Sequence, residues 1–218
     1  AKQFIIGEVT REAIKSIQRV RKDDFAVVVD LLGEATVSEE EADAYMNGYL
    51  ELLDALEKEQ GRWKPLGDQG SDKNGKGEAD QLDWGHAPKI NVSVKPSALY
   101  SQAKPVDLHG SVAAIKARVA TILRRVKAMG GFLCIDMEHR AYKDITLEVY
   151  KQLRADPDFR EYPHFGLVLQ AYLKETDEDL DALLKWARNA HLPISIRLVK
   201  GAYWDYETVV AKQHGLPV

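Results

Sequence analysis

Five apolar segments of the sequence each end in a charged or amide side chain. These residues are Asp30, Lys95, Asp136, Gln170 and Arg197. Any one of them fits an ordinary structural polar group, but at the carboxyl ends of parallel strands all five would converge on one cavity. Two carboxylates, two cations and an amide can hold an anionic substrate or cofactor. The pattern therefore predicts a binding and catalytic site at these strand ends.

Lys95 and Asp136 predict an ion pair that orients a substrate carboxylate. The alternative is a lysine that forms a Schiff base, as in class I aldolases with a barrel fold. A nearby carboxylate favours the protonated lysine, which argues weakly against a nucleophile. A Schiff-base-forming lyase that uses Lys95 therefore stays open as a second hypothesis, and a non-catalytic scaffold as a third.

Asp136, Glu138 and His139 come closest to a metal-binding pattern. On a single strand His139 points away from the two carboxylates. The first apolar segment also lacks the H-x-H pair that is common in metal-dependent barrel hydrolases. We therefore predict no metal ion at this site.

The segment RLVKGAYWDYE, residues 197–207, has the residue types that bind a large, flat, anionic cofactor. Arg197 can stabilise negative charge on a ring system, and Lys200 with a close backbone approach at Gly201 suits a pyrophosphate. The rings of Tyr203 and Trp204 can stack on a base. No G-x-G-x-x-G motif follows any strand, so a Rossmann mode of binding is disfavoured. These residues alone do not decide which cofactor binds.

Strand-like segments alternate with amphipathic helices along the chain. Strands are expected over 25–33, 89–95, 132–138, 165–173 and 193–199, and helices over 10–24, 38–60, 111–129, 145–157 and 176–191. Segment 25–33 has the composition of a fully buried strand. Helix caps are predicted at Ser38 with Glu41 and at Thr176 with Asp179. Strict alternation of strand and helix predicts a parallel sheet.

The strands separate polar from apolar residues at a period of two. A doubly wound sheet is covered by helices on both faces, so both faces should be apolar. One polar face instead favours a (β/α)₈ barrel of the TIM type, of which about the first five units are present. We predict a helical lead-in over 1–24 and a partial barrel over 25–218. A flexible surface insertion is expected over 64–88.

That insertion contains a near match to a phosphate loop at 70–77. The lysine of this sequence is followed by Gly77 instead of Ser or Thr, and no strand–helix context surrounds it. We do not expect it to bind phosphate.

The composition is typical of a globular enzyme. The 218 residues include 34 acidic and 30 basic side chains, a net charge of −4 that offers no general attraction to nucleic acid. The single cysteine, Cys134, excludes an internal disulfide and suits a reducing cytosol. No apolar run approaches the ~20 residues that span a bilayer. We expect a cytoplasmic protein with at most a peripheral contact with the inner face of the cell membrane.

Five motifs resemble the proline dehydrogenase domain of the bifunctional flavoenzyme proline utilization A, in the same order and with similar spacing. They are VVVDLLGEA (27–35), NVSVKPSALY (91–100), CIDMEH (134–139), GLVLQAYLK (166–174) and RLVKGAYWDYE (197–207). The resemblance implies a distorted (β/α)₈ barrel with non-covalent FAD. It also implies oxidation of L-proline to Δ1-pyrroline-5-carboxylate, the first step of proline catabolism to glutamate, with electrons passed to a quinone.

The resemblance also implies roles for individual residues. Catalytic roles fall to Arg197, Lys95 and Asp136, with Arg197 near the flavin N5 that accepts hydride from proline C5. Substrate binding would involve Lys95, Asp136, Tyr203 and Glu34. Cofactor binding would involve Gln170, Arg197, Lys200, Gly201, Ala202 and Trp204.

The family's last strand–helix units, with a pair of arginines for the proline carboxylate, have no counterpart in this sequence. We therefore expect the chain to be part of a longer polypeptide, inactive alone, with an aldehyde dehydrogenase module in the same parent.

Overall fold

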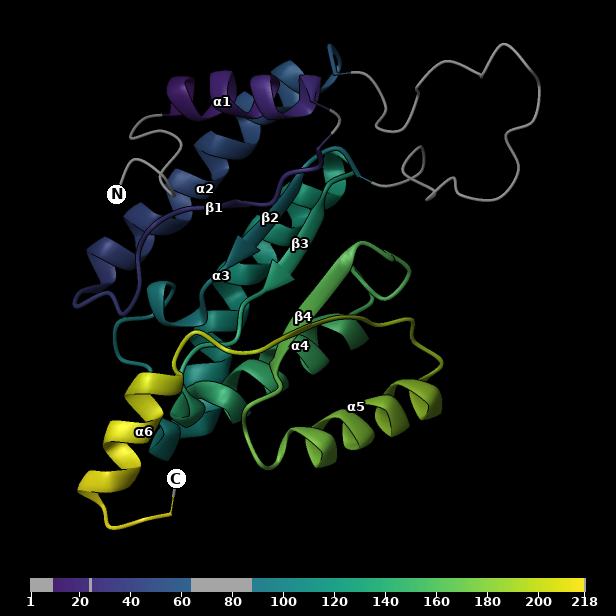
Figure 1. Ribbon diagram of the computed structural model, residues 1–218. Helices are drawn as coiled ribbons and strands as arrows, with labels where there is room; N and C mark the ends of the chain where they lie inside the picture. The colour runs from purple at the N-terminus through teal and green to yellow at the C-terminus, as the bar shows by residue number, and fades with distance from the viewer. Residues whose placement is uncertain (1–9, 24, 64–87, 218) are drawn as a thin grey trace, which may run out of the picture.

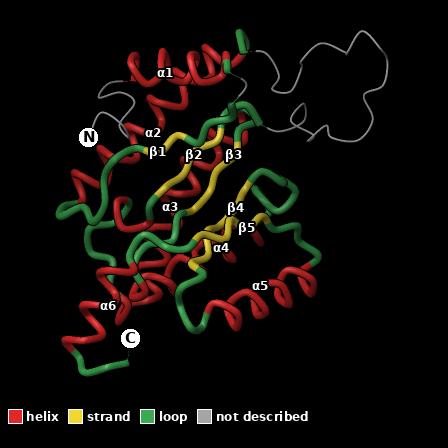
Figure 2. The backbone as a smooth tube through the Cα atoms, in the orientation of Figure 1, coloured by secondary structure: helices red, strands yellow, loops and turns green. Residues whose placement is uncertain are grey.

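The computed structural model describes residues 10–23, 25–63 and 88–217, and its strands form one parallel sheet (Figures 1 and 2). The strand order is the chain order, β1-β2-β3-β4-β5. The bounds are β1 Val29–Asp30, β2 Asn91–Val94, β3 Phe132–Ile135, β4 Phe165–Gln170 and β5 Ser195–Val199. In a doubly wound sheet the order reverses at a switch point. A sequential order without reversal is that of a (β/α) barrel wall, here an open sheet edged by β1 and β5.

Helices connect the strands as predicted, with ends shifted by a few residues. They are α1 Thr10–Lys22, α2 Glu39–Gln60, α3 Leu108–Ala128, α4 Lys143–Ala155, α5 Thr176–Ala190 and α6 Trp204–Gln213. Short 3₁₀ turns cover Pro96–Ala98, Pro105–Asp107 and Arg140–Tyr142. Helices α3 and α4 lie behind the sheet in Figure 1 and pack against each other and against β3 and β4.

The core lies between this helical layer and one face of the sheet. Apolar residues spaced three or four apart along α3 and its C-cap form a stripe that is buried from Val112 to Met129. Alternate strand residues meet it, and all of them are buried: Val92, Val94, Leu133, Ile135, Leu167 and Leu169. Each such side chain stabilises the fold by about 1.5–3 kcal/mol on burial. This packing fixes which strand residues face away from the helices.

The two predicted helix caps have different outcomes. Ser38 Oγ accepts the backbone N–H of Glu41 at 3.2 Å, which confirms the cap of α2. The carboxylate of Glu41 reaches back to the N–H of Val37 at 2.9 Å, one residue earlier than the usual capping box. The predicted cap of α5 is wrong. Thr176 lies inside the helix, and its buried hydroxyl donates to the carbonyl oxygen of Gln170.

The prediction of a long buried strand over 25–33 is also wrong. Only Val29 and Asp30 are in strand conformation, while Phe25, Val28 and Leu32 are 63%, 50% and 73% exposed. The chain leaves β2 after Asp30 because the N–H of the next residue donates to a tyrosine hydroxyl of α2 and not to β2.

The predicted insertion over 64–88 lies outside the described residues apart from Pro88, and so does the near match to a phosphate loop at 70–77. None of the helices in the described ranges is both long and apolar enough to cross a membrane.

Candidate active site

The strand register places polar residues next to one another on the sheet face that points away from the helices. Ser93 pairs with Cys134, and Val168 pairs with Arg197. Lys95 lies two residues after Ser93, and Asp136 lies two residues after Cys134. Because strand side chains alternate with a period of two, both point to the same face as Ser93 and Cys134. Asp30 lies beside Ser93 in the register. The register therefore places four charged residues side by side on this face. We call them the polar row and define it as Asp30, Lys95, Asp136 and Arg197.

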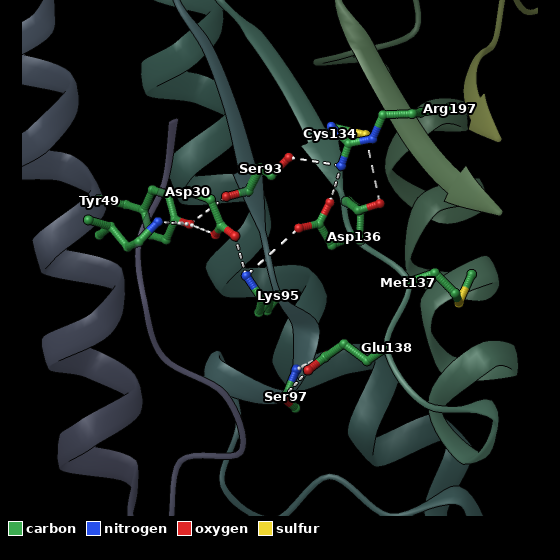
Figure 3. A network of polar contacts seen from close by, with 12 residues as sticks. Asp30, Tyr49, Ser93, Lys95, Ser97, Cys134, Asp136, Met137, Glu138 and Arg197 are labelled. Atoms are coloured by element: carbon green, nitrogen blue, oxygen red, sulfur yellow. Dashed lines mark hydrogen bonds and ion pairs between the residues drawn. The ribbon is translucent and has the colours of Figure 1, made fainter. Parts of the chain in front are cut away.

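Direct contacts connect the polar row (Figure 3). Lys95 Nζ forms an ion pair with the Asp30 carboxylate and lies 3.9 Å from Asp136 Oδ2. Arg197 Nη2 donates to Asp136 Oδ1 and, at 3.2 Å, to Ser93 Oγ. Two carboxylates and two cations thus alternate along the row.

Burial differs along the row and sets its electrostatics. The side chains of Lys95 and Asp136 are 13% and 18% exposed, whereas that of Arg197 is 41% exposed. Burial raises the pKa of the Asp136 carboxyl, and the positive charges of Arg197 and Lys95 act against that rise. Because the Arg197 side chain is partly exposed, its guanidinium group has a side open to solvent, where a ligand can approach it.

Lys95 is a poor candidate for a Schiff-base nucleophile in this arrangement. Its ammonium group donates to Asp30, and a second carboxylate lies nearby. A free amine would have to give up this ion pair with Asp30. The contacts suit a cation that binds an anion.

Gln170 is the fifth predicted strand-end residue, and the structure places it at the end of β4. It is 2% exposed, and its Nε2 donates to the carbonyl oxygen of Met137 at 3.2 Å. Its Oε1 is buried without a hydrogen-bond partner in the described structure. A buried acceptor without a partner is costly, so this oxygen is a natural contact for a ligand N–H or O–H.

The backbone after β5 makes a close approach at Gly201. Its φ of +117° strains any other residue, and a Cβ there would lie 1.8 Å from Cε1 of Tyr172. Lys200 and Ala202 on either side are exposed. Trp204, 50% exposed, and Tyr172 line a groove of about 400 Å³ together with Arg140, Lys174, Glu175 and Glu207.

Tyr203 immediately precedes α6, and Glu34 of the β1–α2 loop lies near its hydroxyl. Burial raises the pKa of the Tyr203 hydroxyl, and the negative charges of Glu138 and Glu34 add to the rise.

Glu138 does not join the polar row, although alternation had placed it on the same face as Asp136. The strand ends at Ile135, and the Glu138 carboxylate turns to accept the N–H of Ser97 at 2.8 Å and the hydroxyl of the same residue. Burial raises the pKa of Glu138. The ring of His139 contacts that of Tyr142 in a tilted arrangement, with ring centroids 4.4 Å apart. In the described ranges, no group of three or more His, Cys, Asp or Glu side chains is arranged to hold a metal ion.

Three residues of this region had no functional interpretation in the sequence. Ser93 bridges toward Arg197, Ser97 anchors Glu138, and the hydroxyl of Tyr49 donates to the carbonyl oxygen of Ser93. The strand alternation did place Ser93 on the polar face. Nothing in the sequence distinguishes the Tyr49 hydroxyl from the apolar stripe of α2.

Comparisons with known proteins give a consistent result. A sequence model of a protein family, described as proline dehydrogenase, matches residues 13–218. The bifunctional protein PutA of Klebsiella aerogenes is 29% identical over 216 residues, which is 98% of this chain and 15% of that protein. A proline dehydrogenase of Deinococcus radiodurans is 29% identical over 211 residues, 96% of this chain and 54% of that protein.

Among solved structures, proline utilization A (PutA) from Bdellovibrio bacteriovorus, inactivated by N-propargylglycine, superposes with a TM-score of 0.87. It is 41% identical and covers 100% of this chain, which in turn covers 22% of that chain. The sequence thus spans 15% of the length of the bifunctional relatives that it matches.

Proposed function

The chain belongs to the proline dehydrogenase family, and from this premise we propose that it supplies the substrate and flavin contacts for oxidation of L-proline to Δ1-pyrroline-5-carboxylate. The observation that carries the proposal is the polar row. Its Arg197 remains open to solvent while Asp136 and Lys95 hold a fixed charge pattern beside it. This arrangement suits a small zwitterion such as proline next to an anionic ring system.

FAD is the cofactor that we propose for this site, and the residues present fit it. The unpartnered Oε1 of Gln170 and the guanidinium of Arg197 suit a polar ring edge. Gly201, without a side chain, permits close backbone approach, Lys200 adds positive charge, and Ala202 is the small residue between Gly201 and Tyr203. The half-exposed ring of Trp204 lies in a groove that suits an adenine. When bound, FAD supplies at N5 an acceptor for a hydride.

The protein's own residues orient the substrate. Lys95 is proposed to bind the proline carboxylate, since its ammonium group is the second cation of the polar row, with Asp136 3.9 Å away. Glu34 and Tyr203, which lie near each other, are proposed to close the substrate side. Oxidation removes a hydride from proline C5 and a proton from its nitrogen, which leaves the C=N bond of the product. No covalent bond to the protein forms, so the catalytic contribution is orientation and charge stabilisation.

We further propose that the electrons pass to a quinone, in a cytoplasmic protein with at most a peripheral contact with the inner face of the cell membrane. An aldehyde dehydrogenase module in the same polypeptide would consume the product. The supporting observation is that relatives covering nearly all of this chain are described as bifunctional.

The test uses the full-length protein that contains this sequence. Its visible spectrum is recorded without oxygen before and after addition of L-proline. Bands of an oxidised flavin that bleach on addition of proline support the proposal, and a colourless protein that FAD does not reconstitute contradicts it. Lys95→Met should weaken proline binding, while Lys185→Met, at an exposed position of α5, serves as the control. Borohydride trapping of a carbonyl substrate on Lys95 would instead favour the lyase.

A further inference from the structure

The ladder between β1 and β2 is interrupted by a side chain. In the neighbouring β2–β3 ladder, the N–H of Asp136 donates directly to the carbonyl oxygen of Val94 at 2.9 Å. The register of β1 against β2 makes the N–H of Leu31 and the carbonyl oxygen of Ser93 the equivalent pair. In the structure, Leu31 N–H donates at 3.2 Å to the Tyr49 hydroxyl, which in turn donates to Ser93. The phenol oxygen therefore occupies the place of one backbone hydrogen bond.

A second tyrosine of α2 completes the replacement. Tyr45 donates its hydroxyl to the carbonyl oxygen of Leu31 at 3.0 Å, and the rings of Tyr45 and Tyr49 contact edge to face with centroids 5.2 Å apart. Both backbone groups of Leu31 are thus satisfied by α2 and not by β2. Tyr49 is 0% exposed, so water does not compete for these bonds.

The interruption occurs beside the first member of the polar row. The Tyr49 oxygen lies 3.4 Å from Asp30 Oδ1, while the other carboxylate oxygen accepts from Lys95 (Figure 3). A phenol has one proton, and the shorter contact assigns it to Ser93. Tyr49 therefore acts on Asp30 mainly through the backbone of Leu31, by setting where β1 separates from β2.

We propose that Tyr49 is a positioning residue for Lys95. Its hydroxyl replaces one bond of the β1–β2 ladder, which fixes the place from which Asp30 reaches the Lys95 ammonium group. The proposal rests on the proposed role of Lys95 in binding the substrate carboxylate. It adds a residue of α2, outside the strand ends, to the determinants of substrate affinity.

Tyr49→Phe is the direct test, with kcat and KM for L-proline measured on the full-length flavin-loaded protein. Lys95 would bind the carboxylate equally in the ground and transition states, and loss of such binding raises KM while kcat stays nearly unchanged. We expect KM to rise about fivefold, the effect of one net hydrogen bond.

The matched control is Tyr150→Phe. Tyr150 is also a helix tyrosine at 0% exposure, and its hydroxyl donates to a strand carbonyl, that of Phe165, at 3.5 Å. Tyr150 lies on α4 and contacts the first residue of β4, away from the polar row. A comparable loss of thermal stability in both variants with a raised KM only in Tyr49→Phe separates positioning from general packing.

A double-mutant cycle tests whether Tyr49 affects substrate binding through Asp30. If Tyr49 acts through Asp30, then Asp30→Asn alone and the double variant should have the same KM, because the second change has nothing left to disturb. Additive effects, or a KM for Tyr49→Phe equal to that of Tyr150→Phe, overturn the proposal. If Tyr49→Phe does not fold, Asp30→Asn decides: an unchanged KM overturns the proposal and a raised KM supports it. A wild-type protein without proline oxidation would instead refute the proposed function.

Discussion

Replacement of Gly201 by alanine tests whether the backbone after β5 is built for close approach. The new Cβ would stand 1.8 Å and 2.0 Å from two ring carbons of Tyr172, so the ring has to move. The φ of +117° adds a backbone cost of about 1–3 kcal/mol for a residue with a side chain. Forcing the ring from its rotamer adds about 0.5–1.5 kcal/mol. We therefore expect Gly201→Ala to destabilise the domain by about 2–4 kcal/mol.

Two other glycines separate the contributions. Gly215 has a φ of +65° and nothing within 4 Å of the Cβ position, so Gly215→Ala should cost only the backbone term, about 1–2 kcal/mol. Gly61 has a φ of −62° and free space, so Gly61→Ala should change stability by less than about 0.5 kcal/mol. The difference between the variants at 201 and 215 then measures the clash with Tyr172 together with the different backbone cost at φ +117°.

Calorimetry of the full-length variants measures these effects as shifts of the unfolding transition, about 2–4 °C per kcal/mol for a domain of this size. The flavin content of the purified proteins is measured in parallel, because displacement of Tyr172 should also lower cofactor retention. A Gly201→Ala protein as stable as Gly215→Ala, with a full flavin content, would show that the close approach has no consequence.

Three further predictions concern the charges and caps. Burial raises the pKa of Glu138 above its ordinary 4.5, so the folded state binds this proton more tightly than the unfolded state does. The contribution of Glu138 to stability is therefore fully present below the unfolded pKa. It is lost as the pH rises from the unfolded pKa to the folded pKa. Glu138→Gln should therefore lose less stability than wild type as the pH rises above the ordinary pKa of 4.5, and an identical pH dependence of the melting temperature would contradict this. Ser38→Ala removes the cap of α2 and should cost about 1 kcal/mol in thermal unfolding. Thr176→Val should leave the capping of α5 intact and remove only the hydroxyl donor to the carbonyl oxygen of Gln170. Lys95→Met should raise KM for L-proline at least about tenfold, the loss of a charge-assisted hydrogen bond, and steady-state kinetics with unchanged KM would refute its substrate role.

The sequence predicts the strand ends well because two local rules act together. Period-2 alternation decides the face, and parallel pairing decides the edge, so Lys95, Asp136 and Arg197 meet in the structure as expected. Helical periodicity likewise predicts the buried stripe of α3. These patterns repeat along the chain, and a repeated pattern is readable without tertiary information.

The features that the sequence did not predict depend on hydrogen bonds to other elements of the fold. β1 is short because two tyrosine hydroxyls of α2 satisfy Leu31, and no propensity of segment 25–33 encodes this. Glu138 leaves the polar face because Ser97 offers two donors after the strand has ended. Thr176 is a good N-cap residue, but its hydroxyl donates to the carbonyl oxygen of Gln170 at the end of β4. In each case a hydrogen bond to another element overrides a local preference.

The sequential strand order also has a consequence for how the domain is assembled during synthesis on the ribosome. Each strand pairs with the strand made immediately before it, so the sheet can grow one unit at a time without waiting for distant segments. The charges of the polar row arrive in the same sequence: negative with Asp30, positive with Lys95, negative with Asp136. A nascent chain that has added β3 and β4 therefore carries an uncompensated carboxylate. Docking of β5 brings Arg197 onto Asp136 and neutralises it, so this strand completes the charge balance of the polar row.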